Sequence, residues 1–216
     1  YNNGKTLAAV IEEVCRYADD IIVVNDGSTD DTANILEQYP AIRTITHPVN
    51  KGKGTALKHG LSQAKKEGFR YAITIDSDGQ HFASDIPCFI EAIEKEPDTL
   101  LVGARNLASD NMPGKNTFAN KFSNFWFRLE TGLKLEDTQS GYRLYPLRKM
   151  DVQSCWYTAK YEFELEAIVF AAWGDVAVKN ISIHVYYPPQ AERVSHFRPF
   201  RDFTRISVLN TVLVLI

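Results

Sequence analysis

Two aspartates, Asp76 and Asp78, follow the apolar segment YAITI at residues 71–75. In extended backbone, residues two apart point to the same side, so both carboxylates face the same space. Such carboxylates repel each other unless a cation lies near them, and Mg²⁺ or Mn²⁺ is commonly held by one or two carboxylates together with substrate phosphates. Gln80 could add a carbonyl oxygen. The pattern predicts a Mg²⁺ or Mn²⁺ site at Asp76, Asp78 and Gln80, with a simple turn as the alternative, because Asp, Ser and Gly are also turn formers.

Two further clusters have the composition of a nucleotide-binding site. In NKGKG, residues 50–54, the glycines allow close backbone approach to a ligand, and Lys51 and Lys53 supply positive charge. NDGSTDDT, residues 25–32, holds Asp26, an acceptor suited to a base or a ribose hydroxyl. Because GxxxxGK[ST] and GxGxxG are both absent from the sequence, neither a P-loop nor a dinucleotide-binding fingerprint is expected.

The clusters must be positioned by the elements that precede them. Each cluster follows a short continuous apolar run, which is typical of buried strands in a parallel sheet, and helical periodicity fills the stretches between the runs. Strands are expected at 21–24, 42–46, 71–75 and 99–102, and helices at 6–18, 30–38, 53–66 and 84–96. This alternation predicts an α/β fold with a central, mostly parallel mixed sheet and helices on both faces. Ligands bind such sheets at the carboxyl ends of the strands, where the polar clusters lie.

The second half of the chain is less regular. Residues 115–130 carry a helical aromatic stripe, which is predicted to be core packing, and a further helix is expected at 161–173. Residues 175–186 alternate apolar and polar, as a half-buried pair of strands would. Neither an internal repeat nor a low-complexity linker interrupts the sequence, so residues 1–216 are predicted to form a single catalytic domain.

Composition narrows the possible partners and compartment. The 216 residues carry a formal net charge of −3, so a surface that binds nucleic acid is not expected. The three cysteines, Cys15, Cys88 and Cys155, have no CxxC spacing and are expected to be buried, reduced thiols. Reduced thiols indicate a cytoplasmic location.

Both ends of the sequence suggest continuation. The opening YNNG is a loop sequence that a strand is expected to precede. Residues 197–216 begin basic and aromatic and then turn apolar, and Arg198, Arg201 and Arg205 recur at steps that would align them on one side of a helix. Such a helix suits a membrane surface, whereas the alternatives are a C-terminal helix packed on the domain or the start of a longer membrane span.

The ordered motifs resemble a known family. VVNDGSTDDT at 23–32, NKGKGTALKHG at 50–60 and TIDSDGQH at 74–81 resemble the inverting family-2 glycosyltransferases with the GT-A fold. Four further motifs resemble the dolichyl-phosphate mannose synthase and polyprenyl-phosphate glycosyltransferase branch: VGARN at 102–106, DTQSGYRLYP at 137–146, YEFELE at 161–166 and RVSHF at 193–197. The resemblance, which covers nearly the whole chain, implies a UDP- or GDP-linked sugar donor, a divalent cation, and work at the cytoplasmic face of a membrane in cell-envelope glycan synthesis.

The resemblance also implies roles for individual residues on the donor side. Tyr1 and Asn3 match the loop that contacts the nucleotide, although an acidic residue is usual at the position of Asn3. Asp26 matches the position that holds the base. The metal and diphosphate motif is matched by Asp76, Asp78 and Gln80.

Other matched residues lie nearer the sugar and the diphosphate. Arg105 and Arg143 match residues that line the sugar and phosphate region. Arg193, Ser195 and His196 match a loop that closes on the diphosphate, and His196 stands where the family often has lysine. The charge at that position therefore depends on pH.

The chemistry of transfer defines what an acceptor-side residue must do. The departing diphosphate is stabilised by a cation and by Arg or Lys groups, while the sugar carbon becomes oxocarbenium-like. An acceptor that attacks from the opposite face inverts the anomeric centre. A lipid phosphate is already an anion, whereas a hydroxyl acceptor needs a carboxylate to take its proton. Asp137 is the candidate for acceptor-side work and Glu136 its substitute, with plain solvent-facing loop residues as the alternative.

Two other classes of function remain open at this stage. A nucleotidyltransferase also uses a metal and an α/β nucleotide site, but it would usually carry a Gly- and Arg-rich phosphate loop, which residues 50–60 do not resemble. A non-catalytic module that binds nucleotide sugars is disfavoured by the presence of Asp76, Asp78 and the 193–197 motif.

Overall fold

The computed structural model describes residues 1–105, 114–151, 158–187 and 199–216, and for residues 114–118 and 199–200 it describes the backbone alone. Its helices and strands occur in the order α1 (Gly4–Val14), β1 (Ile22–Asn25), α2 (Thr32–Glu37), β2 (Arg43–Thr46), α3 (Lys53–Lys66), β3 (Tyr71–Thr74), the 3₁₀ turn η1 (Ala83–Asp85), α4 (Ile86–Lys95), β4 (Leu100–Arg105), α5 (Gly114–Thr131), β5 (Arg143–Pro146), α6 (Glu162–Trp173), β6 (Val178–Ile183) and α7 (Pro199–Leu215). The predicted alternation of strands and helices through residue 102 is confirmed, and α3 has the predicted bounds.

The described strands form two hydrogen-bonded groups. β1 pairs in parallel with β2, and the second group has the order β3-β5-β4-β6. β5 is antiparallel to both of its neighbours, whereas β4 and β6 are parallel. The predicted mixed sheet is therefore present, with more antiparallel pairing than periodicity indicated. β5 was not predicted because its four residues, RLYP, form neither a continuous apolar run nor a clear alternation.

Residues 175–186 form one strand rather than the predicted pair. Only Val178–Ile183 is strand, as β6. The chain then continues past the β3 side of the molecule, where Val185 bridges His81 and the Tyr186 amide donates to the Gln80 carbonyl at 2.8 Å. The segment after β6 therefore lies against the loop that carries the predicted metal ligands.

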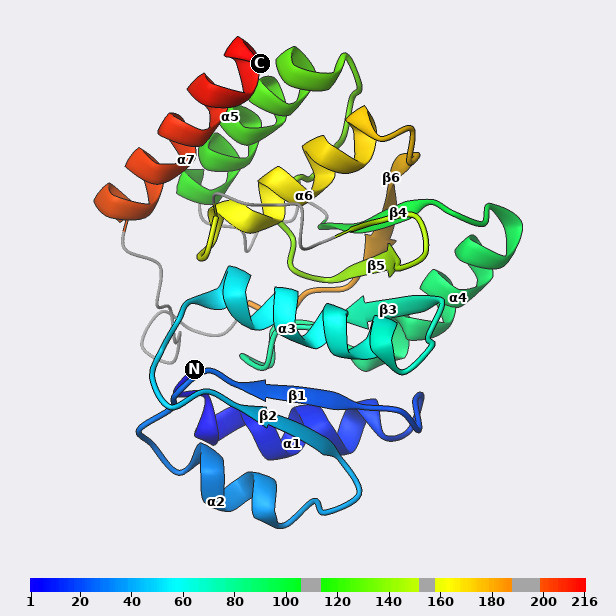
Figure 1. Ribbon diagram of the computed structural model, residues 1–216, viewed down its shortest axis with the longest axis vertical. Coiled ribbons are helices and arrows are strands. Elements are labelled where there is room, and N and C mark those ends of the chain that lie inside the picture. Colours follow the sequence, from blue (N-terminus) through cyan, green and yellow to red (C-terminus); the bar gives the residue numbers. More distant parts are fainter. Residues whose placement is uncertain (106–113, 152–157, 188–198) are drawn as a thin grey trace.

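Helices cover both faces of the sheet, as predicted (Figure 1). Alternate residues of β4 face opposite cores: Leu100 and Val102 pack with α3, α5, α6 and α7, whereas Leu101 packs with α1 and α4. Burial of each such side chain contributes about 1.5–3 kcal/mol, so the two cores hold the sheet between its helical layers. α3 contacts both β1 and β3 and thereby joins the two strand groups.

The direction of β5 decides which residues meet at the functional edge. β1, β3 and β4 all end at this edge, and β5 begins there, because Arg143 pairs with Thr74 on one side and Val102 on the other. The polar segments after three strands therefore meet the segment that precedes a fourth. Antiparallel pairing thus adds the 137–143 loop to the edge predicted from the parallel strands.

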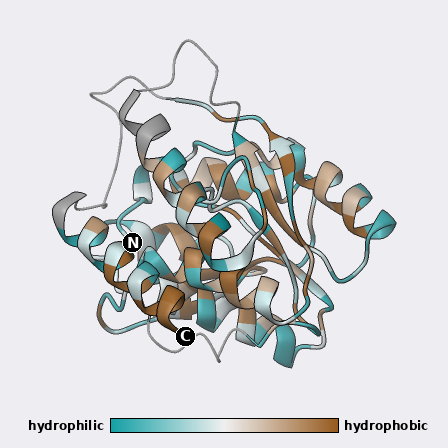
Figure 2. Cartoon of the chain, turned by 90° about the horizontal axis from the view of Figure 1, so that it is seen from above, coloured by the Kyte–Doolittle hydropathy of each residue, from teal (hydrophilic) through white to brown (hydrophobic). Residues whose placement is uncertain are grey.

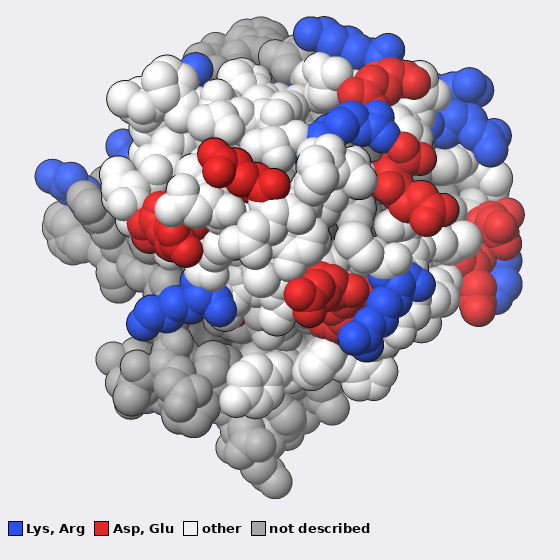
Figure 3. All heavy atoms as spheres, turned by 90° about the horizontal axis from the view of Figure 1, so that it is seen from below, with Lys and Arg blue, Asp and Glu red and all other residues white. Residues whose placement is uncertain are grey.

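Several surface features bear on the expected partners. On the face drawn in Figure 3, acidic and basic side chains are interspersed, and neither sign forms a continuous patch. Among the residues that the structure describes, no helix combines the length and the apolar character needed to cross a membrane. Cys15 and Cys88 are free but exposed, which corrects the prediction that they are buried, because each lies on the solvent side of its helix end.

Candidate active site

The N-terminal segment and the loops after β1 and β3 enclose a small hollow. Its lining includes Tyr1, Asn3, Ser28 and Ser77. Asn3 Nδ2 donates to Ser77 Oγ at 2.9 Å, which joins two of the predicted clusters. Asp30 holds the segment in place by accepting the Gly4 amide at 2.9 Å, at the start of α1. The structure thus brings Tyr1 and Asn3 to the edge predicted for the nucleotide.

Asp26 is buried inside the protein rather than presented to the hollow. It is 3% exposed, and its oxygens accept the Lys51 amide at 2.9 Å and the Gly52 amide at 2.8 Å. His47 Nδ1 lies 2.6 Å from the same carboxylate, and His47 Nε2 lies 2.7 Å from His59 Nδ1 on α3. Burial, and then the neighbouring His47, lower the pKa of His59. Asp26 therefore positions the lysine loop in the described structure, and its contact with a base stays a prediction.

We expect Asp26→Asn to destabilise the protein by about 1–3 kcal/mol, because the asparagine NH₂ would face backbone donors that the carboxylate now accepts. Urea unfolding measures this change, with Asp31→Asn in the same loop as the control. Nucleotide affinity should fall together with stability, since the lysine loop shifts. A loss of nucleotide affinity at unchanged stability would instead favour direct contact with the base.

Lys53 is held between two carboxylates at the centre of the edge. Its Nζ lies 2.9 Å from Asp76 and 2.9 Å from Glu164 on α6. Burial alone would lower the pKa of Lys53, but the charges of Asp76 and Glu164 outweigh it and raise that pKa. Burial would likewise raise the pKa of Asp76, but the Lys53 ammonium holds it below its usual range. Asp76 is therefore an ionised, paired carboxylate.

Asp78 lacks such compensation. Burial, and then the charge of Asp76, raise the pKa of the Asp78 carboxyl. Its Oδ1 accepts the Gln80 amide at 3.0 Å, so the turn alternative and the ligand hypothesis describe the same segment. A carboxylate strained by a like charge beside it is the arrangement that a divalent cation relieves. The residues present fit a Mg²⁺ or Mn²⁺ ion, which Asp78 with Gln80 would hold, and to which Asp76 would contribute beside Lys53.

Gly141 leaves room for this cluster. A Cβ at that position would lie 2.5 Å from Asp76 Oδ2 and 2.8 Å from Lys53 Nζ, both closer than ordinary contact. Only the absence of a side chain lets the 137–143 loop approach the pair so closely. Gly141 thus matters here through space rather than through backbone conformation.

We expect Gly141→Ala to weaken binding of a nucleoside diphosphate with Mn²⁺ by about tenfold or more, since the Asp76 and Lys53 side chains must move away from the methyl group. Because both obstructing atoms are side-chain ends, the unfolding free energy should change by only about 1 kcal/mol or less. Isothermal titration calorimetry and urea unfolding measure the two quantities. Gly174→Ala, whose nearest obstructing atom lies at 3.2 Å, is the control. Equal binding by Gly141→Ala would contradict the prediction.

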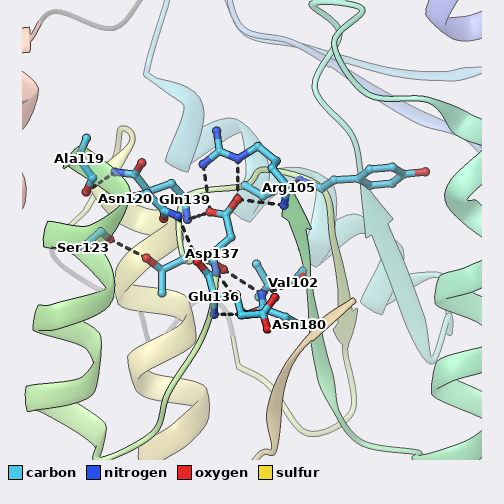
Figure 4. Close-up of polar contacts among 12 residues, drawn as sticks. Val102, Arg105, Ala119, Asn120, Ser123, Glu136, Asp137, Gln139 and Asn180 are labelled. Atoms are coloured by element: carbon cyan, nitrogen blue, oxygen red, sulfur yellow. Dashed lines mark hydrogen bonds and ion pairs between the residues drawn. The ribbon is translucent and has the colours of Figure 1, made fainter. Parts of the chain in front are cut away.

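Asp137 is fully buried and paired with Arg105 (Figure 4). Arg105 donates to it through Nε at 2.5 Å and Nη2 at 3.0 Å, and the Gln139 amide donates to Oδ1 at 2.9 Å. Burial would lower the pKa of Arg105, but the bond to Asp137 raises it. With both oxygens occupied, Asp137 is poorly placed to take a proton from an acceptor. The ion pair orients Arg105 in the described structure, which favours a positioning role, and the acceptor-side role of Asp137 stays a prediction.

The substitute candidate, Glu136, is exposed, and its backbone is bonded within the same network. Its amide donates to Asn180 Oδ1 at 2.6 Å, and its carbonyl accepts Asn120 Nδ2 at 3.1 Å (Figure 4). Asn180 Nδ2 also donates to the carbonyls of Val102 and Asp137. Asn180 therefore joins β4, β6 and the 137–143 loop, and it fixes the backbone on which Asp137 is placed.

Arg143 is bonded within the protein interior, and its place in the sugar and phosphate region stays a prediction. The side chain is fully buried. It donates to the carbonyls of Ser140 at 2.7 Å and Thr138 at 2.9 Å, and also to the carbonyl of Glu164. A guanidinium with these partners ties the 137–143 loop to the first turn of α6. Burial raises the pKa of Asp76, whereas the charges of Lys53, His81 and, more weakly, Arg143 lower it.

The remaining predicted residues and the residues that sequence reading missed complete the inventory. Arg193, Ser195 and His196 lie outside the described residues. Glu164 received no role, although it lies in the motif YEFELE, because α6 is buried on all sides and shows no apolar stripe that would single it out. The contact between His47 and His59 was not predicted, because no sequence signal connects the two residues.

Comparisons with known proteins show the family of the chain. The model of the family described as glycosyl transferase family 2 matches residues 1–152. The chain is 29% identical over 238 residues to UDP-N-acetylglucosamine–dolichyl-phosphate N-acetylglucosaminyltransferase of Methanococcus voltae, covering 100% of this chain and 95% of that protein. It is 27% identical over 208 residues to a dolichyl-phosphate beta-glucosyltransferase of Trichomonas vaginalis, covering 85% and 62%.

A solved structure shows the same fold. Glucosyl-3-phosphoglycerate synthase from Mycobacterium tuberculosis, crystallised with Mn²⁺, UDP-glucose and phosphoglyceric acid, superposes with a TM-score of 0.67 at 19% identity. The match covers 99% of this chain and 75% of that one. The predicted GT-A-like fold is confirmed by this likeness.

Proposed function

We propose that this chain, which belongs to glycosyl transferase family 2, moves a sugar from a nucleoside diphosphate to the phosphate of a dolichyl or other polyprenyl lipid. That it is a glycosyltransferase follows from the family. The observation that carries the donor half of the proposal is the meeting of the Asp76–Asp78 pair with Lys53, beside the hollow lined by Tyr1 and Asn3. Carboxylates for a metal and a cation for phosphate thereby share one edge with the polar loops that line the hollow.

The acceptor half of the proposal has two supports. The similar proteins from Methanococcus voltae and Trichomonas vaginalis are named for dolichyl phosphate. In this chain, the carboxylate of Asp137, the candidate for acceptor-side work, is buried and paired with Arg105. A phosphate acceptor is already an anion and needs no protein base, so it suits a site whose carboxylate is occupied. Attack on the face opposite the diphosphate would invert the sugar carbon.

The divalent cation belongs to the same proposal. Asp78 and Gln80 would hold it, with Asp76 beside Lys53. When bound, such an ion neutralises charge on the departing diphosphate. The Lys53 ammonium lies within the same cluster and contributes positive charge to that region. Asn3, which contacts Ser77, would keep the loop of the carboxylates against the nucleotide hollow.

The test is an assay with three donors: UDP-glucose, UDP-N-acetylglucosamine and GDP-mannose, each with a short-chain polyprenyl phosphate and Mn²⁺. The proposal expects a lipid-linked sugar and release of the free nucleoside diphosphate with one of them. Formation of a sugar 1-phosphate and a nucleoside triphosphate when pyrophosphate is added would point to a nucleotidyltransferase, and binding without turnover to a non-catalytic module. Transfer only to a hydroxyl acceptor, such as an octyl glycoside, would overturn the lipid-phosphate half.

The C-terminal helix and α5 together supply an apolar surface for this acceptor. α5 and α7 lie side by side, with the rings of Phe122 and Phe203 5.1 Å apart (Figure 1). Phe125 on α5 is 60% exposed and Val208 on α7 is 58% exposed, and the C-terminal part of α7 is strongly hydrophobic (Figure 2). Arg201 and Arg205 are exposed on the same helix. We propose that this face rests on a membrane, as apolar helices with basic neighbours do.

We expect the protein to co-sediment with liposomes that contain phosphatidylglycerol, and Arg201→Glu/Arg205→Glu to weaken this binding by about tenfold or more, because each basic group near an anionic surface is worth about 1 kcal/mol. Arg16→Glu/Lys95→Glu makes the same charge change at exposed positions elsewhere, in the turn after α1 and at the end of α4, and serves as the control. If the protein stays in the supernatant, or both variants bind equally well, a soluble acceptor becomes the better hypothesis.

A further inference from the structure

Glu164 has an unusual position for a residue without an assigned role. It lies in the first turn of α6 and is 6% exposed. One carboxylate oxygen, Oε2, lies 2.9 Å from Lys53 Nζ. The other, Oε1, is buried and has no hydrogen-bond partner among the residues that the structure describes. Buried carboxylate oxygens are nearly always hydrogen-bonded, so an open one indicates a missing donor.

The contacts of Glu164 place it at the candidate active site. Lys53 Nζ bridges it to Asp76, the first of the two predicted metal ligands. Its carbonyl accepts a hydrogen bond from Arg143, so the 137–143 loop fixes the turn of α6 that carries it. Burial lowers the pKa of Arg105, whereas Asp137, Tyr187 and, more weakly, the charge of Glu164 raise it. The second oxygen, Oε2, and the backbone of Glu164 are therefore both bonded to residues of the site.

The missing donor is better explained by a hydroxyl group than by a metal ion. The Lys53 ammonium already lies between Asp76 and Glu164, where a cation shared by these carboxylates would have to lie. A divalent ion at that position would be repelled by the ammonium at short range. A neutral O–H group is not repelled, and it donates a strong bond to an ionised oxygen. The diphosphate offers only acceptors, whereas the transferred sugar, like the ribose, offers hydroxyl donors.

We propose that Glu164 is a donor-binding residue that accepts a hydrogen bond from a hydroxyl of the transferred sugar, while its second oxygen keeps Lys53 against Asp76. The inference rests on the proposed function, because it presumes a nucleotide-sugar donor. It assigns Glu164 a role in choosing the sugar, because a site built to bond a hydroxyl rejects a donor that lacks it. Nucleoside diphosphate alone should sense this residue much less, because Asp76 still pairs with Lys53 when Glu164 is replaced.

The test compares the affinities of a nucleotide sugar and of its nucleoside diphosphate for the wild type, Glu164→Gln and Glu164→Asp. Isothermal titration calorimetry with Mn²⁺ is run with UDP-glucose, UDP-N-acetylglucosamine, GDP-mannose, UDP and GDP. We expect the sugar to strengthen binding in the wild type, and both variants to lose about 10- to 100-fold of sugar-dependent affinity. Affinity for the nucleoside diphosphate should change by less than about threefold. Glu164→Asp keeps the charge and shortens the side chain, so it serves if Glu164→Gln fails to fold.

Glu162→Gln, a buried carboxylate in the same turn of α6, is the control and should keep the sugar-dependent gain. Monodeoxy analogues of the best-bound donor complete the design. The analogue that lacks the hydroxyl bonded by Glu164 should bind the wild type more weakly than the parent donor does. Its affinity for Glu164→Gln should equal its affinity for the wild type. The inference is overturned if the variants keep the sugar-dependent gain, or if they lose sugar and nucleoside diphosphate affinity alike. If no nucleotide sugar binds the wild type while UDP or GDP does, Glu164 recognises no donor sugar, and the inference fails; if no nucleotide binds at all, the proposed function itself fails.

Discussion

Replacement of Asp78 by asparagine is expected to reduce sugar transfer by about 10²–10³-fold, because the site would lose the carboxylate that holds the charge-stabilising cation. Stability should stay equal or rise slightly. Burial and the charge of Asp76 raise the pKa of Asp78, so the folded state holds its proton more tightly than the unfolded state. The ionised form therefore opposes folding as pH rises through that range, and asparagine removes this penalty.

Two measurements separate this expectation from general damage. Transfer is followed by mass spectrometry of the lipid product, and stability by thermal unfolding at about pH 4, near the pKa of an unfolded aspartate, and at about pH 7. The melting temperature of the wild type should fall relative to that of Asp78→Asn between the two values. Asp19→Asn, an exposed change of the same kind, should alter neither quantity. Activity of the wild type that persists in EDTA, or of Asp78→Asn at the level of the wild type, would contradict the assignment.

Asp137→Asn is expected to destabilise the protein by about 3–5 kcal/mol and to lower transfer together with stability. Removing one partner of a buried ion pair leaves the other charge without compensation. The asparagine would keep one acceptor oxygen, but its NH₂ group would face a guanidinium N–H that the carboxylate now accepts. Urea unfolding measures the first effect, and Glu136→Gln, an exposed neighbour, is the matched control.

A double variant distinguishes a positioning role from a catalytic base. In Asp137→Asn/Arg105→Met the unpaired guanidinium is gone, so the loss of stability should be smaller than the sum of the single losses. Transfer should not recover, since Arg105 itself is absent. If Asp137→Asn instead abolishes transfer at wild-type stability and removes an ionisation from the pH profile of kcat, Asp137 acts as the base and the positioning role is wrong.

Asp78 and Asp137 were both predicted as site residues from short motifs, but their surroundings differ. Asp78 belongs to a local pattern: two carboxylates two residues apart after a strand, whose repulsion follows from spacing alone. Asp137 precedes SGYR, and its spacing reveals nothing about Arg105, 32 residues away in the sequence. Local patterns are therefore informative about groups that share a turn, and less so about groups that meet through pairing of distant strands.

The elements that carry the donor side were within reach of sequence reading for the same reason. Strands β1 and β3 are continuous apolar runs, and helix α3 has helical hydrophobic periodicity. Each of the three has a polar segment at one end, so each could be recognised from its own residues. The 137–143 loop has no such signal. It reaches the site because β5 runs antiparallel and starts at the edge where β3 and β4 end.

The α/β class, the edge at which the polar clusters meet and the Asp76–Asp78 pair could be predicted from the amino-acid sequence, because hydrophobic patterns and short spacings are properties of neighbouring residues. The partner that each buried charge finds could not be predicted in this way. Asp26 is enclosed by the lysine loop, Arg143 by backbone carbonyls and Asp137 by Arg105, whereas Glu164 keeps one oxygen open. The physical reason is that a charge removed from water must find its partner in space, and that partner is set by strand pairing and helix packing rather than by distance along the chain.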